Sequence, residues 1–186
     1  MNSFSLIKYD YKRYSKENSN PLKILFFNQN FWATSWFRIM NGLYFTLRKI
    51  PVVRQLVGFL GMIILKLSQI FTGISIPIGT EIGKGLYISH SGAIIVNGKV
   101  KIGENCNIAP MVVIGWGKSK NKFGTPIIGD RVWIGPGAKI FGPITIGDDV
   151  AIGANAVVNK TIPNRAVVVG ANKIVSYNSS KEYIQY

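Results

Sequence analysis

The feature that most constrains this chain is an aliphatic residue that returns every six positions through its second half. The beat shifts by two residues after Val100, breaks at an insertion over residues 116–127, and then resumes. An α-helix, with 3.6 residues per turn, cannot keep a period of six on one face. A solenoid coil with three short flat faces can, because each sixth residue then points into the stack. The positions in phase are Ile76, Ile82, Ile88, Ile94, Val100, Ile102, Ile108, Ile114, Ile128, Ile134, Ile140, Ile146, Ile152 and Val158.

Glycine follows the aliphatic residue at many of these positions. We interpret it as the residue that permits a tight corner between two flat faces. The glycines concerned are Gly83, Gly103, Gly115, Gly129, Gly135, Gly147 and Gly153. The pattern predicts a mainly β protein with a parallel β-helix over residues 76–175 and a C-terminal tail over residues 176–186.

The first 75 residues have a different composition and are predicted to be helical. Asn20-Pro21 is a plausible helix start. Pro51 breaks the helical region, and residues 52–71 form a further helix. The predicted apolar stripe of the middle helix is Phe31, Trp36, Ile39, Met40, Leu43 and Tyr44. Two interpretations stay open for this region: packing on the second half or a neighbouring subunit, or a cationic, apolar surface for a membrane-borne substrate.

Charge and hydropathy limit the kinds of partner and the location that this protein can have. The chain carries 22 Lys and Arg against 8 Asp and Glu, a net charge of +14, which favours anionic partners. The start is polar, without the apolar run of a secretory signal. The most apolar run, residues 56–65, is shorter than the roughly 20 residues that span a membrane. We therefore expect a cytoplasmic protein that contacts the inner membrane face without crossing it.

Four blocks carry a family resemblance: Ile82 to His90, Ile102 to Ile108, Pro126 to Ile140, and Ile152 to Val158. They resemble the left-handed β-helix hexapeptide acyltransferases. The most similar branch is that of the serine acetyltransferases, including the O-acetyltransferases found among capsule and exopolysaccharide enzymes. The resemblance covers residues 76–175 and extends more weakly to residues 31–44. It implies a left-handed coil, a homotrimer with active sites between neighbouring prisms, and acetyl-CoA as the donor.

His90 is the candidate general base and the only histidine of the chain. Imidazole titrates near neutrality, so it can take a proton from a hydroxyl and return one to a thiol. It stands where the motif of the resembled family has its catalytic histidine. The oxyanion would be stabilised by a backbone N–H, with Gly115 or Trp116 as the candidates. No protein nucleophile is needed, so we interpret Cys106 as a buried structural residue.

The expected acetyl-CoA contacts come from small residues, free backbone groups and cations. We expect three successive coils to align these residues in one column, and the lysines near the C-terminus to meet the phosphates. A single surface lysine is more often only a solvated charge. The insertion at residues 118–122 is cationic and could cover the bound substrate. The candidates are Gly115, Trp116, Gly117, Pro136, Ala138, Ala154, Lys139, Lys160 and Lys173.

Departures from the serine acetyltransferase pattern guide the expected acceptor. Ser75 stands where that enzyme has the carboxylate that orients its histidine, and Thr125 stands where it has a second histidine. With Asn97, they are the candidate acceptor contacts. We therefore expect a sugar hydroxyl of a cell-surface polysaccharide or of its lipid-linked precursor as the acceptor. The alternative is serine O-acetylation in cysteine biosynthesis.

Other functions of such a solenoid are less consistent with the sequence. A carbonic-anhydrase-like zinc site needs three histidines, so no metal is expected. A nucleotidyltransferase needs a further domain that the helical region has no room for. A basic, non-enzymatic binding solenoid stays open, but dispersed cations without a recognisable module argue against nucleic acid as its partner.

Overall fold

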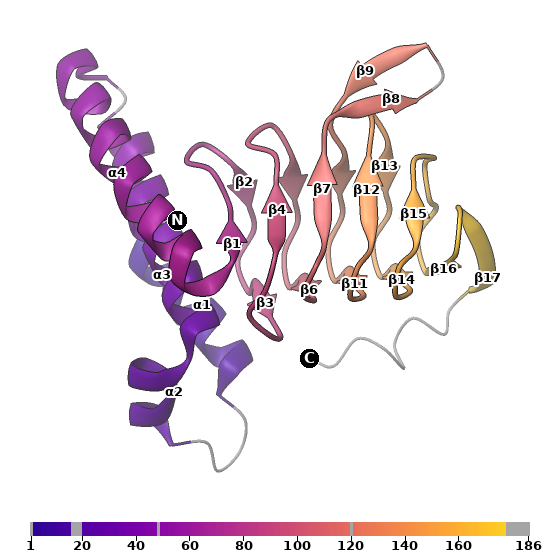
Figure 1. Cartoon of the computed structure of the whole chain (residues 1–186), viewed down its shortest axis with the longest axis horizontal. Helices are drawn as coiled ribbons and strands as arrows, with labels where there is room; N and C mark the ends of the chain where they lie inside the picture. Colours follow the sequence, from indigo (N-terminus) through magenta and orange to yellow (C-terminus); the bar gives the residue numbers. More distant parts are fainter. Residues whose placement is uncertain (1, 16–19, 48, 120, 178–186) are drawn as a thin grey trace.

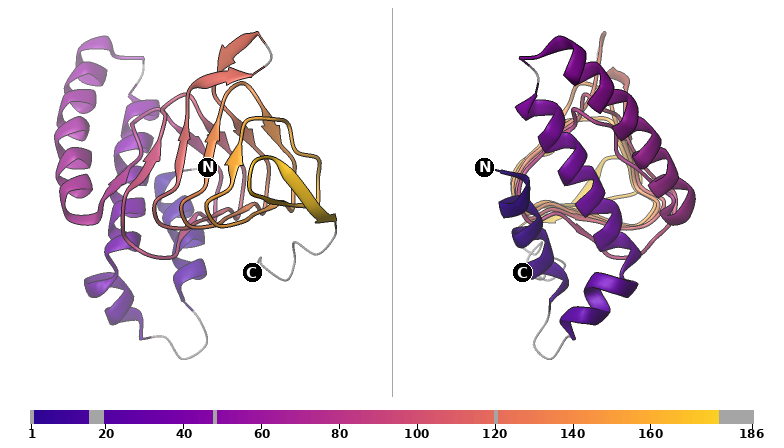
Figure 2. Two further views of the ribbon diagram at one scale, coloured as in Figure 1. Left: turned by 45° about the vertical axis from the view of Figure 1, so that its right-hand side comes forward. Right: turned by 90° about the vertical axis from the view of Figure 1, so that its left-hand side faces the viewer.

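The computed structural model describes residues 2–15, 20–47, 49–119 and 121–177, and the predicted tail beyond Tyr177 lies outside them. Four helices precede a left-handed parallel β-helix, as predicted (Figure 1). The helices lie across the N-terminal end of a triangular prism, which Figure 2 shows end-on. The β-helix begins at Ile74, two residues after the last helix ends.

Three sheets form the faces of the prism, and we name them A, B and C. Sheet A contains β1 (Ile74–Ser75), β4 (Ile94–Val96), β7 (Val113–Gly115), β12 (Lys139–Phe141) and β15 (Val157–Val158). Sheet B contains β2 (Glu81–Ile82), β5 (Lys101–Ile102), β10 (Ile127–Ile128) and β13 (Thr145–Ile146). Sheet C contains β3 (Tyr87–Ile88), β6 (Asn107–Ile108), β11 (Trp133–Ile134), β14 (Ala151–Ile152), β16 (Ala166–Val169) and β17 (Lys173–Tyr177). Only β16 and β17 pair antiparallel within these sheets.

The register explains the irregularities of the six-residue beat. Lys139 pairs with Val157 eighteen residues later, which is one coil of three hexads. Glu81 pairs with Lys101, so the first coil holds the two extra residues of the phase shift. Val113 pairs with Lys139, because this coil also holds an antiparallel hairpin of β8 (Gly117–Ser119) and β9 (Lys122–Gly124).

The repeat positions build the core as predicted. Every aliphatic residue in phase is buried, with at most 9% of its surface exposed. The stacked coils place like residues on one another, for example Ile134 between Ile108 and Ile152 on sheet C. The interior is therefore a continuous column of isoleucine and valine, which is the dominant source of its stability.

The glycines of the repeat have a different role from the predicted one. None of the seven has a positive φ, so they do not supply an unusual corner conformation. At Gly83 and Gly103 the missing side chain lies against the backbone of the next coil: a Cβ on Gly103 would lie 2.6 Å from the carbonyl carbon of Gly129. Close stacking of the coils requires glycine here. Asn and Arg residues such as Asn105 and Arg131 adopt the left-handed turn conformation instead.

The helices are α1 (Ser3–Tyr14), α2 (Pro21–Phe27), α3 (Gln29–Thr46) and α4 (Pro51–Thr72). Asn20 caps α2 through its side chain, in agreement with the sequence, and α4 begins at Pro51, one residue before the predicted helix of residues 52–71. The predicted stripe of α3 is correct only in part. Phe31 and Met40 are buried, but Trp36 and Leu43 are more than 40% exposed, because α3 packs through Phe37 and Arg38 instead.

The length of the apolar helix corrects another expectation. By length and composition α4, with 22 residues, could cross a membrane, although its most apolar run, residues 56–65, is too short to do so alone. Just 11% of its most apolar window is buried, so α4 is not a core helix.

A buried ion pair fixes the helices to the first coil. Arg38 of α3 and Asp10 of α1 pair at 2.8 Å, with 2% and 1% of their side chains exposed. Arg38 also donates to the carbonyl oxygens of Ile82 and Gly83, and Asp10 accepts from the backbone N–H of Leu86 at 2.8 Å. The pair thus joins two helices to the segment that leads into β3 and His90.

Candidate active site

His90 lies at the corner where the chain passes from sheet C to sheet A, between β3 and β4. Its side chain is exposed. Among the described residues no hydrogen bond or ion pair to His90 is found, so the imidazole is open to a substrate. A general base must come within hydrogen-bond reach of the proton that it takes, and an exposed imidazole on a fixed corner leaves that position free for a substrate.

Hydrogen bonds on three sides hold the corner that carries His90. Ser89 donates its backbone N–H to Ile108 in the next coil at 3.3 Å, and Gly92 donates to Thr72 at the end of α4 at 3.1 Å. The hydroxyl of Ser91 donates to the buried side-chain oxygen of Asn30 at 2.7 Å. Sequence reasoning missed Asn30, because it lies 61 residues from Ser91 and only the tertiary fold brings the two together.

Two of the predicted CoA residues lie on the same corner as His90. Asn155, beside Ala154, donates its backbone N–H to Pro136 at 2.8 Å, and both Pro136 and Ala154 are exposed. The coil above continues the column, since Gly137 donates to Pro110 at 2.9 Å. A ladder of small residues and prolines therefore runs down the prism edge from the histidine, and it leaves room for an extended ligand.

The predicted alignment of Gly115, Trp116 and Gly117 with this column is wrong. Gly115 pairs with Phe141, and a Cβ on Gly117 would lie 2.8 Å from the Phe141 ring, at the opposite edge of sheet A. The hairpin is the reason. It lengthens this coil by eight residues, so the separation of about twenty residues between Gly115 and Pro136 is less than one full coil of the prism.

Ala138 must also leave the set of CoA contacts. It is fully buried, its N–H donates to Gly135, and its carbonyl accepts from Val113. Its side chain belongs to the core, so it has no surface to offer a ligand on the outside of the prism.

The three predicted lysines lie apart. Lys139 lies on the outer face of sheet A, and its Nζ donates to the carbonyl oxygen of Met111 at 2.5 Å. Lys160 follows β15 at the corner from sheet A toward sheet B, and Lys173 begins β17 at the C-terminal end of the solenoid. They do not form one cluster in a single chain.

Lys160 instead borders a groove below the hairpin. This groove has a volume of about 710 Å³, and Lys118 and Lys122 line it from the hairpin side. Ser119 joins the two walls, because its hydroxyl donates to the carbonyl oxygen of Asn159 at 2.9 Å. Three ammonium groups around one groove favour a phosphorylated ligand. The cationic insertion was a signal for this groove in the sequence.

Aromatic rings stiffen the hairpin. Trp116 stacks on Phe123 with 6.3 Å between ring centroids, and the Nζ of Lys99 lies 5.8 Å from the Trp116 centroid. Both rings are more than half exposed. The hairpin therefore presents a flat apolar surface with cations around it.

The three candidate acceptor contacts are also distributed. Ser75 is half-buried on β1, on the outer face of sheet A, opposite Ile95. Asn97 accepts from the N–H of Lys99 at 3.0 Å, and the hydroxyl of Thr125 donates to the Lys99 carbonyl at 2.9 Å. Asn97 and Thr125 thus lie with the hairpin, at the edge of sheet A opposite to His90. Their roles stay predictions.

Cys106 is fully buried, as expected, and its thiol lies 3.2 Å from the carbonyl oxygen of Gly129. Burial raises the pKa of the Cys106 thiol from 9.0 to about 12. A neutral, enclosed thiol is a poor nucleophile. Among the described residues no group of three His, Cys, Asp or Glu side chains could hold a metal ion.

Comparisons with known proteins agree on one group of enzymes. Residues 125–160 match the family of bacterial transferase hexapeptide repeats. The serine acetyltransferase of Helicobacter pylori strain J99 is 41% identical over 114 residues, which cover 61% of this chain and 66% of that enzyme. The serine acetyltransferase of Synechococcus elongatus is 31% identical over 160 residues, 86% of this chain and 62% of that enzyme. The chain thus spans just under two thirds of the length of these relatives.

Solved structures give the same result. The serine acetyltransferase of Neisseria gonorrhoeae superposes with a TM-score of 0.79 at 26% identity, covering 94% of this chain and 66% of that one. A structure of the same enzyme in complex with serine gives a TM-score of 0.74 at 28% identity, with coverage of 94% and 69%. The shared part includes the helices as well as the prism.

These similarities contradict the expected polysaccharide acceptor. The similar proteins are serine acetyltransferases, so the capsule and exopolysaccharide type finds no support. At Ser75 and Thr125 this chain lacks two side chains of the serine acetyltransferase pattern. Absence of two contacts from a pattern does not identify the molecule that binds instead.

Proposed function

We propose that this chain, whose repeat region is of the bacterial hexapeptide transferase type, is an acetyl-CoA-dependent serine O-acetyltransferase that supplies cysteine biosynthesis. The observation that carries the proposal is His90, an exposed base on a corner fixed from three sides. The similarity to serine acetyltransferases across 86% of the chain supports serine as the acceptor.

The chemistry requires one base and no protein nucleophile. His90 accepts the proton of the serine hydroxyl while the hydroxyl oxygen attacks the thioester carbonyl carbon. The tetrahedral intermediate collapses, the carbon–sulfur bond breaks, and the CoA sulfur receives the proton from the imidazolium. O-acetylserine and free CoA are the products. Direct transfer is consistent with the burial of Cys106, the single cysteine of the chain.

The arrangement of the candidate residues supports a site shared between subunits. His90 lies at one edge of sheet A, whereas Trp116 and Thr125 lie at the other. A neighbouring prism that presents its hairpin to the His90 corner would bring the two sets together. We therefore propose a homotrimer, in which the backbone N–H groups of Gly115 or Trp116 face the oxyanion of the adjacent subunit.

The CoA moiety would follow the prism edge. Pro136 and Ala154 offer a smooth path for the pantetheine arm beside His90. Lys118, Lys122 and Lys160 offer cations for the phosphates, at the groove below the hairpin that a neighbouring subunit would present. Lys139 and Lys173 stay as further candidates on the outer surface.

The experiment is to incubate the protein with acetyl-CoA and L-serine and to follow CoA release with a thiol-reactive chromophore. Because Cys106 is buried, the protein thiol adds little to the signal. We expect His90→Ala and His90→Asn to lower turnover roughly 10²- to 10⁴-fold, and Val175→Ala, an exposed change on β17, to leave it unchanged. Mass spectrometry should show O-acetylserine. No transfer to serine by the folded protein would refute the acceptor, and normal turnover by both His90 variants would refute the base.

A further inference from the structure

One face of α4 is apolar and is exposed among the residues that the structure describes. We name this face the α4 outer stripe: Val52, Leu56, Phe59, Leu60, Ile63, Leu67, Ile70 and Phe71. The spacing of three and four residues puts them on one side of the helix. Each has between 44% and 77% of its surface exposed. With a rise of 1.5 Å per residue, the stripe runs for about 30 Å. A surface helix of a soluble protein turns such a face inward.

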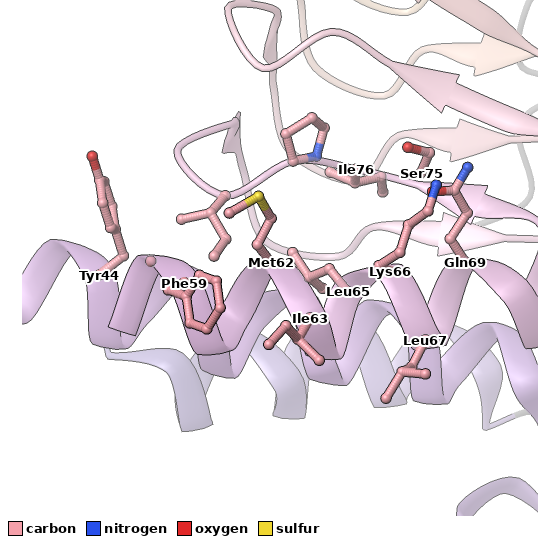
Figure 3. A pocket seen from close by; sticks show the side chains of 13 residues that line it. Tyr44, Phe59, Met62, Ile63, Leu65, Lys66, Leu67, Gln69, Ser75 and Ile76 are labelled. Atoms are coloured by element: carbon pink, nitrogen blue, oxygen red, sulfur yellow. The ribbon is translucent and has the colours of Figure 1, made fainter. Parts of the chain in front are cut away.

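The opposite side of α4 is fixed to the prism. Gly61 is buried, and a Cβ there would lie 2.5 Å from Ile78 of the first coil. In Figure 3 Met62 and Leu65 point toward that coil. They line a groove of about 730 Å³, and three stripe residues, Phe59, Ile63 and Leu67, also border it. The helix therefore cannot rotate to bury the stripe. Nor can lipid surround it while it stays on the prism, so α4 as placed does not span a bilayer.

The basic residues around α4 indicate which kind of partner covers the stripe. Residues 21–80 contain no Asp or Glu, and they contain five Lys and Arg besides Arg38, whose charge is buried against Asp10. Lys49, Arg54 and Lys66 lie on or next to α4, and all three are exposed. Two copies of this helix would bring like charges together, without the acidic partners that flank a homotypic helix seam. An anionic lipid surface offers both an apolar interior and negative headgroups.

We propose that α4 lies flat in the surface of an anionic lipid bilayer. The outer stripe enters the boundary between headgroups and acyl chains, and the exposed lysines near it, Lys49 and Lys66, stay at the headgroups. The enzyme is then peripheral. Binding at this face does not depend on the acetyl acceptor, so it stands or falls separately from the proposed function.

The test is sedimentation of the full-length protein with vesicles. One set contains phosphatidylglycerol and phosphatidylcholine, and the other contains phosphatidylcholine alone. We expect binding to the anionic set, weakened at least tenfold when salt is raised from 0.05 M to 0.5 M, because screening shortens the range of surface charges. The variant Leu60→Gln/Ile63→Gln/Leu67→Gln should bind at least tenfold more weakly. Its side chains are exposed, so the fold and the acetyltransferase activity should be retained. The matched control is Val175→Gln/Tyr177→Gln, which changes exposed apolar residues of β17.

A second measurement reports insertion. Leu60→Trp adds one indole on the stripe, and the difference from the wild-type fluorescence should shift to the blue with anionic vesicles. Equal vesicle binding by the triple variant and the wild type would overturn the proposal, as would no binding by the wild type. If the triple variant instead forms a smaller assembly in light scattering, with vesicle binding unchanged, the stripe is a contact between copies and the membrane proposal is wrong.

Discussion

Removal of the Asp10 charge is expected to destabilise the protein strongly, because it leaves a buried guanidinium uncompensated. Arg38 is 2% exposed and donates to Asp10 as well as to two backbone carbonyls. Asp10→Asn keeps the volume of the side chain, removes its charge, and turns one of the two acceptor oxygens into an amide donor. Breaking a buried pair in this way typically costs about 3–5 kcal/mol. For a chain of this size the midpoint of thermal unfolding should fall by roughly 10 °C.

The two variants that break the pair, Asp10→Asn and Arg38→Met, should differ in how their stability depends on pH. Burial raises the pKa of Asp10 above its usual 3.8, although Arg38 opposes this. Arg38→Met removes the opposing charge, so the pKa of Asp10 rises further. A raised pKa gives stability that is present at low pH and lost as pH rises, so Arg38→Met should be less destabilised at pH 5 than at pH 8. The guanidinium left by Asp10→Asn cannot lose its proton. The stability lost in Asp10→Asn should therefore be nearly the same at pH 5 and at pH 8.

The assay is denaturant unfolding followed by far-ultraviolet circular dichroism, at a fixed protomer concentration because assembly contributes to stability. The matched control is Glu81→Gln, which removes an acid from an exposed pair with Lys101 at 3.1 Å and should cost less than about 1 kcal/mol. A loss below about 1 kcal/mol for Asp10→Asn would refute the reasoning. Equal pH dependence of the two buried variants would refute the account of the charges.

Three further predictions follow from the solenoid. Gly103→Ala should cost about 1–3 kcal/mol in the same unfolding assay, because the new Cβ meets the backbone of the next coil; Gly115→Ala, where no atom lies within 4 Å, should cost much less, and equal losses would contradict the stacking argument. Cys106 should resist thiol reagents at pH 8 in the native state and react in denaturant, because its pKa is about 12; rapid labelling of the native protein would show that the thiol is accessible. Light scattering should give three times the chain mass of 20.6 kDa, and an active monomer would exclude a site shared between subunits.

The fold was largely readable from the sequence, because its determinants are local and repeat. The aliphatic residue at each sixth position of the repeat is buried, from Ile76 to Val158, since the coil has three flat faces of six residues. Asn20-Pro21 marked a helix start, and Pro51 marked the boundary before the next helix, through the backbone chemistry of those residues alone. His90 was found in the same way, from its place in a short motif.

The surroundings of the candidate base depended on contacts between distant segments. The hairpin after Gly115 lengthened one coil, so Gly115 and Pro136 lie at different corners although their sequence separation suggested one column. Asn30 reaches Ser91, and Asp10 reaches Arg38, across intervals that no local pattern encodes.

The sequence by itself determined the period, the core and the identity of the candidate base, because a repeating coil turns local composition directly into burial. The tertiary structure decided which residues share a corner, why glycine follows the aliphatic residue, and which way α4 turns its apolar side. Those outcomes depend on how coils and helices approach one another. Gly103 shows the reason: a Cβ there would meet the backbone of Gly129, which is distant in the sequence and in contact only after folding.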